Sequence, residues 1–316
     1  MSLAASMAFL PSGTIAQTAR VHRVVLVGIN PIGLAKHLLN AFEQGLRELG
    51  RVPGRDVIIE VRSAGGDRAR YPDLVKAVVQ SKPDVILTSI NSNTLPVKAA
   101  TQTIPIVMVI GTDVVASGLV RSLAQPGGNV TGLTWELGPE SAAKRMELLK
   151  QLAPATSRVG FYWEVPYGAD YLKAPQQAAA ALGLQSAARE YSGDIERDVA
   201  ELRRQDVDAL YVHHAAELFS RRAELARVAA RYALPTVCGS AELVDAGALM
   251  SYGPSLSELF RRAAGYVDKI LKGAKPAELP VERPSNPELV INQATAKALR
   301  LSLAPSLRAR ADRIVD

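Results

Sequence analysis

Residues 84–107, DVILTSINSNTLPVKAATQTIPIV, run from an apolar segment into a cluster of hydroxyl and amide side chains between Thr88 and Thr94. The cluster contains no acid, base or thiol, whereas a catalytic site usually carries at least one side chain that can transfer a proton. This composition favours binding over catalysis. We expect Ser92, Asn93 and Thr94 to begin a helix, whose free backbone N–H groups and dipole attract a carboxylate or another anion. Capping of that helix alone would select the same residue types without any ligand.

Aromatic and charged side chains follow the first strand predicted in the second half of the chain. Trp163 and Tyr167 lie at the end of the segment RVGFYWEVPY and would supply an apolar or stacking wall for a ligand. Trp163 has the alternative of filling the core, whereas Tyr167 follows a proline in a loop and is expected to be exposed. Asp113 or Glu164 would favour an amino acid if either pairs with a ligand ammonium group. If neither faces the ligand, an aromatic or aliphatic carboxylate is favoured.

The sequence gives little support to metal or cofactor sites. His213 and His214 are adjacent, and neighbouring strand residues point to opposite faces, so at most one of them faces a shared site. No carboxylate accompanies them at metal-ligand spacing, and the segment GINPIG lacks the middle glycine of a dinucleotide-binding motif. The single cysteine, Cys238, excludes a disulfide within the chain and is predicted to be buried and inert. We predict no metal, no cofactor and no catalytic residue.

Composition and charge indicate a globular protein. The 316 residues suffice for two domains. The net charge is +6 and the pI is about 9.4, but basic and acidic residues are interleaved, whereas a nucleic-acid surface needs a clustered basic stripe. No nucleic-acid partner is expected, and no apolar run is long enough to span a membrane. Residues 3–19, LAASMAFLPSGTIAQTA, suggest the remainder of a secretory signal that lacks its basic segment; a disordered tail is the alternative.

The chain repeats one plan twice. The apolar runs RVVLVGINP and RVGFYWEVP, 135 residues apart, both stop at a proline, which is typical of a buried strand and its exit loop. Each is followed by a helical stretch that ends in glycine, at Gly50 and Gly183. A second strand then leads to an aspartate suited to capping the next helix, at Asp67 and Asp194. Four strands alternating with helices in each half predict two parallel sheets with right-handed crossovers.

Three segments rich in glycine or proline, 124–132, 247–255 and 280–288, are suited to chain crossings between the two halves. Three crossings would form a hinge. Ligands of open α/β sheets bind outside the carboxyl ends of the strands. Two such lobes facing each other would place all their strand exits around one cleft, so the exits provide the candidate binding residues.

Several segments resemble a known protein family. GLVRSLAQPGGNVTGL at 118–133, GALMSYGPS at 247–255 and the stretch 266–312 are similar to the bacterial ABC-transporter substrate-binding proteins whose members include tryptophan-binding lipoproteins. The resemblance extends from about residue 22 to the end. It implies a type I periplasmic binding-protein fold, an α/β architecture of two Rossmann-like lobes with parallel sheets, joined by a three-crossing hinge, with a small ligand between the lobes.

The resemblance and the strand exits together assign lobes and site residues. One lobe is expected at 22–132 plus 254–283 and the other at 133–253 plus 284–316, after a residual signal or disordered tail at 1–21. Two loops, Asp113-Val114 and His213-His214-Ala215-Ala216, stand where relatives have Asp-Pro, and the second departure suggests a ligand different from theirs. The ligand-binding candidates are Asn30, Ser89, Ser92, Asn93, Thr112, Asp113, Trp163, Tyr167, His213, Ser240 and Tyr252.

The expected function is that of a monomeric periplasmic solute receptor. It would close by hinge rotation on a carboxylate-bearing ligand, an amino acid or an aromatic acid, and present the closed form to the transmembrane subunits of an ABC permease. Membrane anchoring is left open. An α/β enzyme acting on a small metabolite is an alternative, but it needs a cofactor loop or a proton-transfer pair. The effector-sensing core of a transcription regulator is another, and it should carry a helix-turn-helix before the first strand, where this chain has few and apolar residues.

Overall fold

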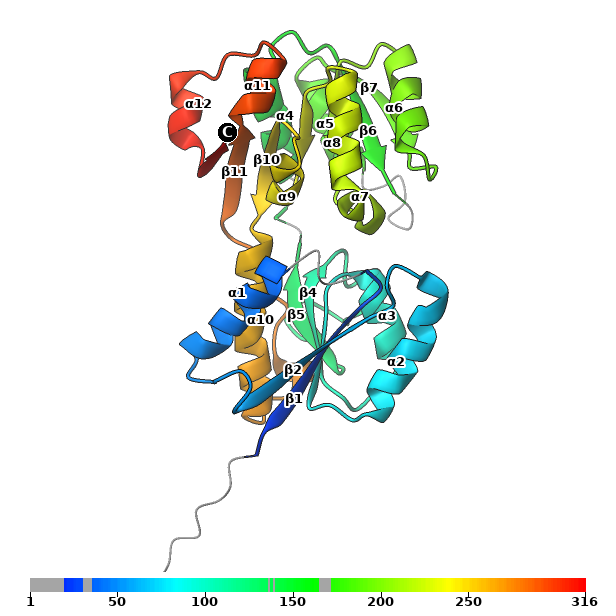
Figure 1. Ribbon diagram of the computed structural model, residues 1–316, viewed down its shortest axis with the longest axis vertical. Coiled ribbons are helices and arrows are strands. Elements are labelled where there is room, and N and C mark those ends of the chain that lie inside the picture. Colours follow the sequence, from blue (N-terminus) through cyan, green and yellow to red (C-terminus); the bar gives the residue numbers. More distant parts are fainter. Residues whose placement is uncertain (1–19, 31–35, 136, 139, 165–171) are drawn as a thin grey trace, which may run out of the picture.

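The computed structural model describes residues 20–30, 36–135, 137–138, 140–164 and 172–316, which form two α/β lobes (Figure 1). Lobe 1 contains a five-stranded sheet in the order β2-β1-β3-β4-β5, in which every neighbouring pair is parallel. Its strands are β1 (His22–Gly28), β2 (Val57–Ser63), β3 (Val85–Thr88), β4 (Ile106–Gly111) and β5 (Val130–Thr134). One face of the sheet packs on α1 (Lys36–Glu48) and α10 (Leu256–Leu271), and the other on α2 (Tyr71–Gln80) and α3 (Asn91–Ala100).

Lobe 2 contains a seven-stranded sheet in the order β12-β11-β10-β9-β8-β6-β7. Its strands are β6 (Arg158–Trp163), β7 (Gln185–Glu190), β8 (Ala209–Val212), β9 (Thr236–Cys238), β10 (Met250–Pro254), β11 (Pro287–Asn292) and β12 (Arg313–Val315). The helices on one face are α4 (Glu140–Leu152), α5 (Lys173–Ala181), α11 (Gln293–Ala298) and α12 (Pro305–Arg310). Those on the other are α6 (Ile195–Arg204), α7 (Ala216–Ser220), α8 (Arg222–Arg231) and α9 (Ala241–Asp245).

The strand orders confirm the predicted two-lobe α/β fold and its internal duplication. Strands β6 to β10 follow the order 7-6-8-9-10, which repeats the order 2-1-3-4-5 of lobe 1 with each number raised by five. The predicted parallel pairing holds for β6 to β10 and for β11 with β12, and β11 departs from it in lobe 2 by pairing antiparallel with β10. Strand β10 runs toward the junction between the lobes and β11 enters lobe 2 from that junction, so the two neighbours must run in opposite directions.

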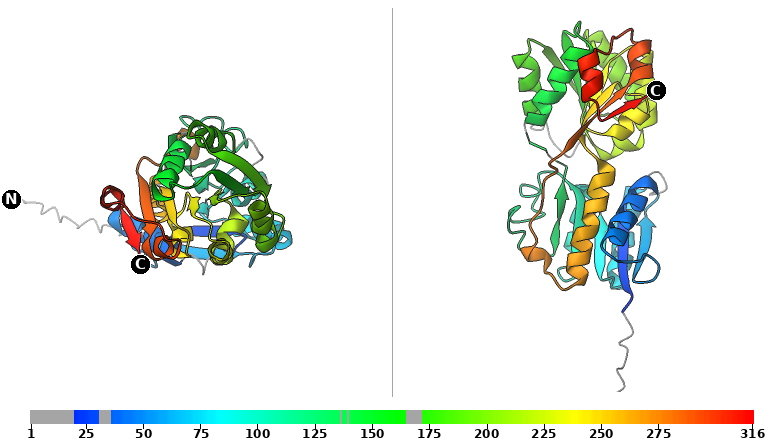
Figure 2. Two further views of the ribbon diagram at one scale, coloured as in Figure 1. Left: turned by 90° about the horizontal axis from the view of Figure 1, so that it is seen from above. Right: turned by 90° about the vertical axis from the view of Figure 1, so that its left-hand side faces the viewer.

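The chain crosses between the lobes three times (Figures 1 and 2). It passes from β5 to α4, from β10 to α10, and from η4 (Pro276–Glu278) to β11. Helix α10 directly follows β10 of lobe 2 in the sequence but packs in lobe 1 beside α1. At this contact, a Cβ atom at Gly45 of α1 would lie 2.3 Å from the carbonyl oxygen of Arg261 on α10. The absence of a side chain at Gly45 therefore permits this close helix contact.

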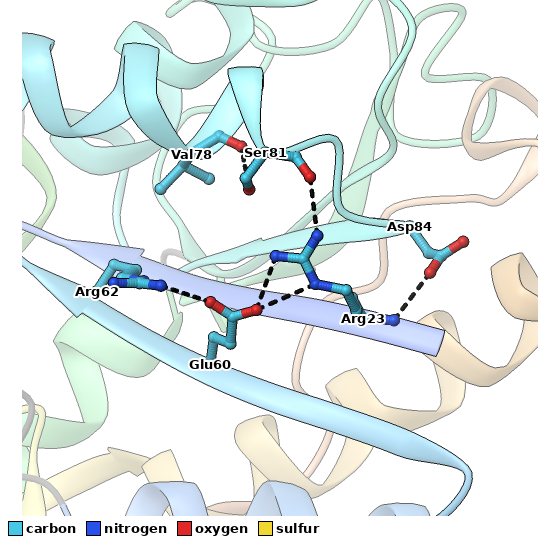
Figure 3. Close-up of polar contacts among 6 residues, drawn as sticks. All are labelled: Arg23, Glu60, Arg62, Val78, Ser81 and Asp84. Atoms are coloured by element: carbon cyan, nitrogen blue, oxygen red, sulfur yellow. Dashed lines mark hydrogen bonds and ion pairs between the residues drawn. The ribbon is translucent and has the colours of Figure 1, made fainter. Parts of the chain in front are cut away.

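One arginine ties together the start of β1, the strand β2 and the end of α2 (Figure 3). The guanidinium of Arg23 donates from Nε and Nη2 to Glu60 on β2, at 3.1 and 2.7 Å, and from Nη1 to the carbonyl oxygen of Ser81, at 2.8 Å. The backbone N–H of Arg23 donates to Asp84, just before β3, at 2.8 Å. A single residue thus fixes the register of three neighbouring elements.

The same arrangement occurs in lobe 2 around Arg158. Its guanidinium donates to Gln185 on β7 and, from Nη1, to the carbonyl oxygen of Gln205 at the end of α6, at 2.6 Å. Its backbone N–H donates to Asp208, just before β8, at 3.0 Å. The duplication therefore extends from strand order to individual hydrogen bonds.

Candidate functional site

A cavity lies between the two lobes at the exits of β1 and β3. Strand order reverses between these neighbours, and open α/β sheets bind ligands at such a switch point. The space between atoms is about 1010 Å³, counting the part that opens to solvent, which suits a small organic molecule. The larger apolar lining residues are Leu26, Ile29, Leu38, Leu39, Ile90, Ile110, Phe219, Leu256 and Phe260, and the polar ones are Asn30, Arg68, Ser89, Ser92, Asn93, His214, Ser220 and Arg222.

The structure brings some of the predicted binding residues to this cavity and not others. Asn30, Ser89, Ser92 and Asn93 line it, whereas His213 and Ser240 line a smaller neighbouring cavity in lobe 2. Thr112, Asp113, Trp163 and Tyr252 line neither, and Tyr167 lies outside the described residues.

The residues that miss the cavities are held elsewhere by local geometry. Trp163 packs against the lobe 2 core, because its side chain projects from β6 toward the face that carries α4 and α5. Tyr252 lies within β10 and packs against the same core. Asp113 is exposed in the loop after β4, where its φ of 44° turns the chain. Trp163, Tyr252 and Asp113 therefore line neither cavity, because the end of a strand does not fix the direction of its last side chains, and their role in ligand binding stays a prediction.

Asn93 connects α3 to the ends of β1 and β3. Its side-chain oxygen accepts from the N–H of Ile29 at 3.3 Å, and its side-chain nitrogen donates to the hydroxyl of Ser89 at 2.7 Å. Its carbonyl oxygen accepts from the buried hydroxyl of Tyr71 at 2.9 Å. Asn93 is 5% exposed. Most of its hydrogen-bonding groups bond to other residues of the cavity wall, so few remain for a ligand.

Asn91 connects the start of α3 to the loop that follows β4, the next strand in the sheet. Its side chain donates to the carbonyl oxygen of Thr112 at 2.5 Å and accepts from the N–H of Thr112 at 3.0 Å. Both backbone hydrogen-bonding groups of Thr112 are thereby bonded to Asn91 of α3, and Thr112 does not line the cavity. Sequence reasoning did not single out Asn91, although it belongs to the polar cluster that ends β3.

The start of α3 is the part of this cluster that remains available. The helix begins at Asn91 with Ile90 as N-cap, and no side chain caps it, so the capping interpretation of the cluster is wrong. Within the described residues, the N–H groups of Asn91 and Ser92 and the hydroxyl of Ser92 have no hydrogen-bond partner. Ser92 lines the cavity, and this helix end therefore offers donors and a positive dipole to a ligand.

Lobe 2 provides an aromatic wall that the sequence did not predict. The ring of His214 stacks on Trp135, with centroids 4.1 Å apart and planes inclined by 20°. Its other neighbour is Phe219, at 5.5 Å in an edge-on arrangement. The guanidinium carbon of Arg222 lies 5.0 Å from the centroid of the Phe219 ring. His214 and Phe219 line the cavity, whereas Trp135 packs on His214 and lines neither cavity.

His213 and its neighbour His214 are neutral near pH 7. Burial, together with the charge of nearby Arg145, lowers the pKa of His213 to about 4, and burial with His213 and Arg145 lowers the pKa of His214 to about 3. Arg145 is itself buried on α4, where Nε donates to the carbonyl oxygen of Tyr252 at 2.7 Å and Nη1 to the hydroxyl of Tyr211 at 2.9 Å. Both of these partners of the Arg145 guanidinium are neutral, and no described carboxylate pairs with it.

Three polar contacts join the two lobes. Arg68 of lobe 1 lies 3.1 Å from a carboxylate oxygen of Glu217 and 3.6 Å from one of Glu164, both in lobe 2. Glu164 also accepts from the N–H of Glu217 at 2.9 Å, and burial raises its pKa. His37 on α1 lies 3.6 Å from Glu242 on α9, whose pKa burial also raises.

Several lining residues escaped the sequence analysis. Arg68, Phe219, Ser220 and Arg222 line the cavity, yet no motif marks them. Arg68 follows the capping residue Asp67, and the other three lie one or two turns beyond the β8 exit. All four lie in the loop or in the first helical turns after a strand exit, which is the sequence signal that they share.

Among the described residues, no group of three or more His, Cys, Asp and Glu side chains is arranged to hold a metal ion. In that part of the chain, no helix has the length and apolar character needed to cross a membrane.

The family described as ABC transporter substrate binding protein matches residues 25–315. The chain belongs to this family. The predicted resemblance is thereby confirmed, together with the type I periplasmic binding-protein fold that it implies. The description of this family is substrate binding for ABC transporters.

Other proteins resemble this chain in sequence or in fold. A tyrosine-binding protein of Clostridioides difficile (strain R20291) is 27% identical over 267 residues, covering 82% of this chain and 75% of that protein. A conserved domain protein of Vibrio cholerae O1 biovar El Tor has a TM-score of 0.84 at 25% identity, covering 93% of this chain and 100% of that chain. The ABC domain in complex with L-Trp from Streptococcus pneumoniae has a TM-score of 0.85 at 23% identity, covering 94% of this chain and 100% of that chain.

Proposed function

We propose that this protein is the extracytoplasmic solute-binding component of an ABC importer. It captures a small carboxylate-bearing organic ligand, an amino acid or an aromatic acid, between its lobes. The observation that carries the proposal is the cavity at the switch point of lobe 1, which is completed by side chains of lobe 2. A ligand that contacts both lobes stabilises their closed arrangement, because it binds that arrangement with greater affinity than the open one.

The chemistry of the cavity supports an organic acid as the ligand. The start of α3 provides unpaired N–H groups and the Ser92 hydroxyl, which suit a carboxylate. Apolar side chains such as Leu38, Ile110 and Phe260 line the remainder, and they suit an aliphatic or aromatic body. The closed protein would then dock on the transmembrane subunits of a permease as a monomer, in the periplasm or at an equivalent extracytoplasmic surface.

Thermal denaturation with a panel of amino acids and aromatic acids tests the proposal. The protein should first be unfolded and refolded to remove any ligand carried through purification. We expect at least one panel member to raise the melting temperature, because a ligand that binds only the folded state stabilises it. Small-angle X-ray scattering should show a smaller radius of gyration with the same compound. No stabilisation by any amino acid or organic acid would contradict the proposed ligand class.

A further inference from the structure

We propose that Arg222 of lobe 2 joins the start of α3, which lines the same cavity, in recognising the acidic group of the ligand, and that the ligand carries no ammonium group. The ligand would then be an aromatic or aliphatic carboxylate in place of an α-amino acid. This inference rests on the proposed solute-binding function and deepens it. It is carried by the position of Arg222 and by the charges around the cavity.

Arg222 is placed to meet a ligand. It begins α8 and lines both the main cavity and the smaller one beside it. Its Nη1 donates to the carbonyl oxygen of Phe219 at 3.0 Å, and its guanidinium carbon lies 5.0 Å from the ring centroid of the same residue. Phe219 thus holds the guanidinium against the cavity wall while most of its five N–H donors remain available.

Arg222 has no carboxylate partner among the described residues, which separates it from its neighbour. Arg221 donates twice to the Glu224 carboxylate, at 2.8 Å each, and to the carbonyl oxygen of Gly193. The charge of Arg221 is therefore compensated within the protein. A partly buried guanidinium without such a partner is suited to a bidentate contact with a ligand carboxylate.

Cavity charges disfavour an ammonium group. The described lining residues include two arginines and no aspartate or glutamate. Glu164 and Glu217 do not line the cavity, and both carboxylates lie against Arg68. Buried Arg145 lies outside the lining and has no described carboxylate partner. An ammonium group bound here would lose its water without meeting a carboxylate of a described lining residue, which is strongly unfavourable.

The test compares acids that differ only in the ammonium group. Isothermal titration calorimetry should use 3-phenylpropionate against L-phenylalanine and 4-methylpentanoate against L-leucine, with refolded, ligand-free protein. We expect the acid without the ammonium group to bind at least 10-fold more tightly in at least one pair. If an amino acid binds more tightly than its counterpart, the inference fails and the solute-binding proposal stands. If none of the four binds, the carboxylate class itself fails and the inference with it.

A matched pair of variants tests the role of Arg222. Arg222→Gln should weaken binding of 3-phenylpropionate about 10- to 100-fold, the range expected for loss of a charge-assisted hydrogen bond. Arg221→Gln, on the neighbouring residue, should change it less than 2-fold. Equal weakening by both variants, or none by Arg222→Gln, would overturn the assignment.

A neutral probe tests the same idea without mutation. Wild-type protein should bind 3-phenylpropanamide at least 10-fold more weakly than 3-phenylpropionate, because the amide cannot form an ion pair with a guanidinium. Binding of the two compounds with equal affinity would contradict recognition of the acidic group by a cation.

Discussion

Removal of Arg68 should favour separation of the lobes. Its guanidinium reaches from lobe 1 to two carboxylates of lobe 2, at 3.1 Å from Glu217 and 3.6 Å from Glu164. These contacts exist only while the lobes are together. Arg68→Ala should therefore lower both the closed fraction of the free protein and the affinity for a ligand that binds between the lobes.

The size of the effect follows from exposure. The side chains of Arg68 and Glu217 are 50% and 32% exposed, and such pairs contribute about 0.2–1 kcal/mol. Glu164 is 8% exposed, so its contact with Arg68 is less screened by solvent. A combined loss of about 1 kcal/mol corresponds to a decrease in ligand affinity of about 5-fold.

Spin-label distances between the lobes provide the assay. Labels at cysteines introduced at Lys76 on α2 and Arg227 on α8, both exposed, would report lobe separation. Cys238 should not compete for label, because it is buried and burial raises its pKa to about 12. Arg70→Ala is the control, since Arg70 is exposed in the same turn and its side chain forms no hydrogen bond or ion pair with another described residue. An unchanged distance distribution and unchanged affinity in Arg68→Ala would refute the reasoning.

Three further predictions concern stability. Asn93→Ala should lower the free energy of unfolding by about 1–3 kcal/mol in urea titrations, because it leaves buried polar groups without partners; a loss below about 0.5 kcal/mol would contradict its bridging role. Gly132→Ala should lower the melting temperature far more than Gly50→Ala, since a Cβ atom at Gly132 would lie 2.0 Å from a backbone oxygen, whereas Gly50 has open space; equal effects would contradict the close approach. Burial raises the pKa of Asp198, but hydrogen bonds from its neighbours outweigh burial, and the net pKa is lowered. Ionised Asp198 therefore stabilises the folded protein fully above about pH 4, the pKa of an aspartate in the unfolded chain. This stabilisation is lost as the pH falls through the pKa of Asp198 in the folded protein. Acid titrations monitored by circular dichroism should show a shallower loss in Asp198→Asn, and an unchanged pH dependence would refute this.

The sequence predicted the lobe 1 side of the cavity better than the lobe 2 side. Ser89, Ser92 and Asn93 follow a buried strand directly, so their place at the sheet edge is fixed by a few residues of local structure. Phe219 and Arg222 lie on α7 and α8, and the contact of Glu164 with the start of α7 helps to fix where these helices sit. Such a contact between distant segments has no signature in local sequence.

Local patterns were most informative where one residue performs a local task. Asp67 and Asp194 cap the elements that follow them, each accepting from a backbone N–H at 2.9–3.0 Å, as predicted. Gly50 and Gly183 end their helices with φ values of 81° and 71°, also as predicted. The direction of β11 could not be predicted in this way, because it depends on where the chain returns from the other lobe.

The sequence alone determined that the chain forms two copies of one α/β plan, since strand periodicity, helix caps and helix-ending glycines act within a few residues. Only the tertiary structure decided which side chains face each other across the cavity. Arg68 and Glu217 are 149 residues apart, and Trp135 stacks on His214, which lies 79 residues further along the chain. A side chain's direction relative to its own helix or strand is set locally, whereas its distance from the other lobe is set by the three crossings and the packing of α10.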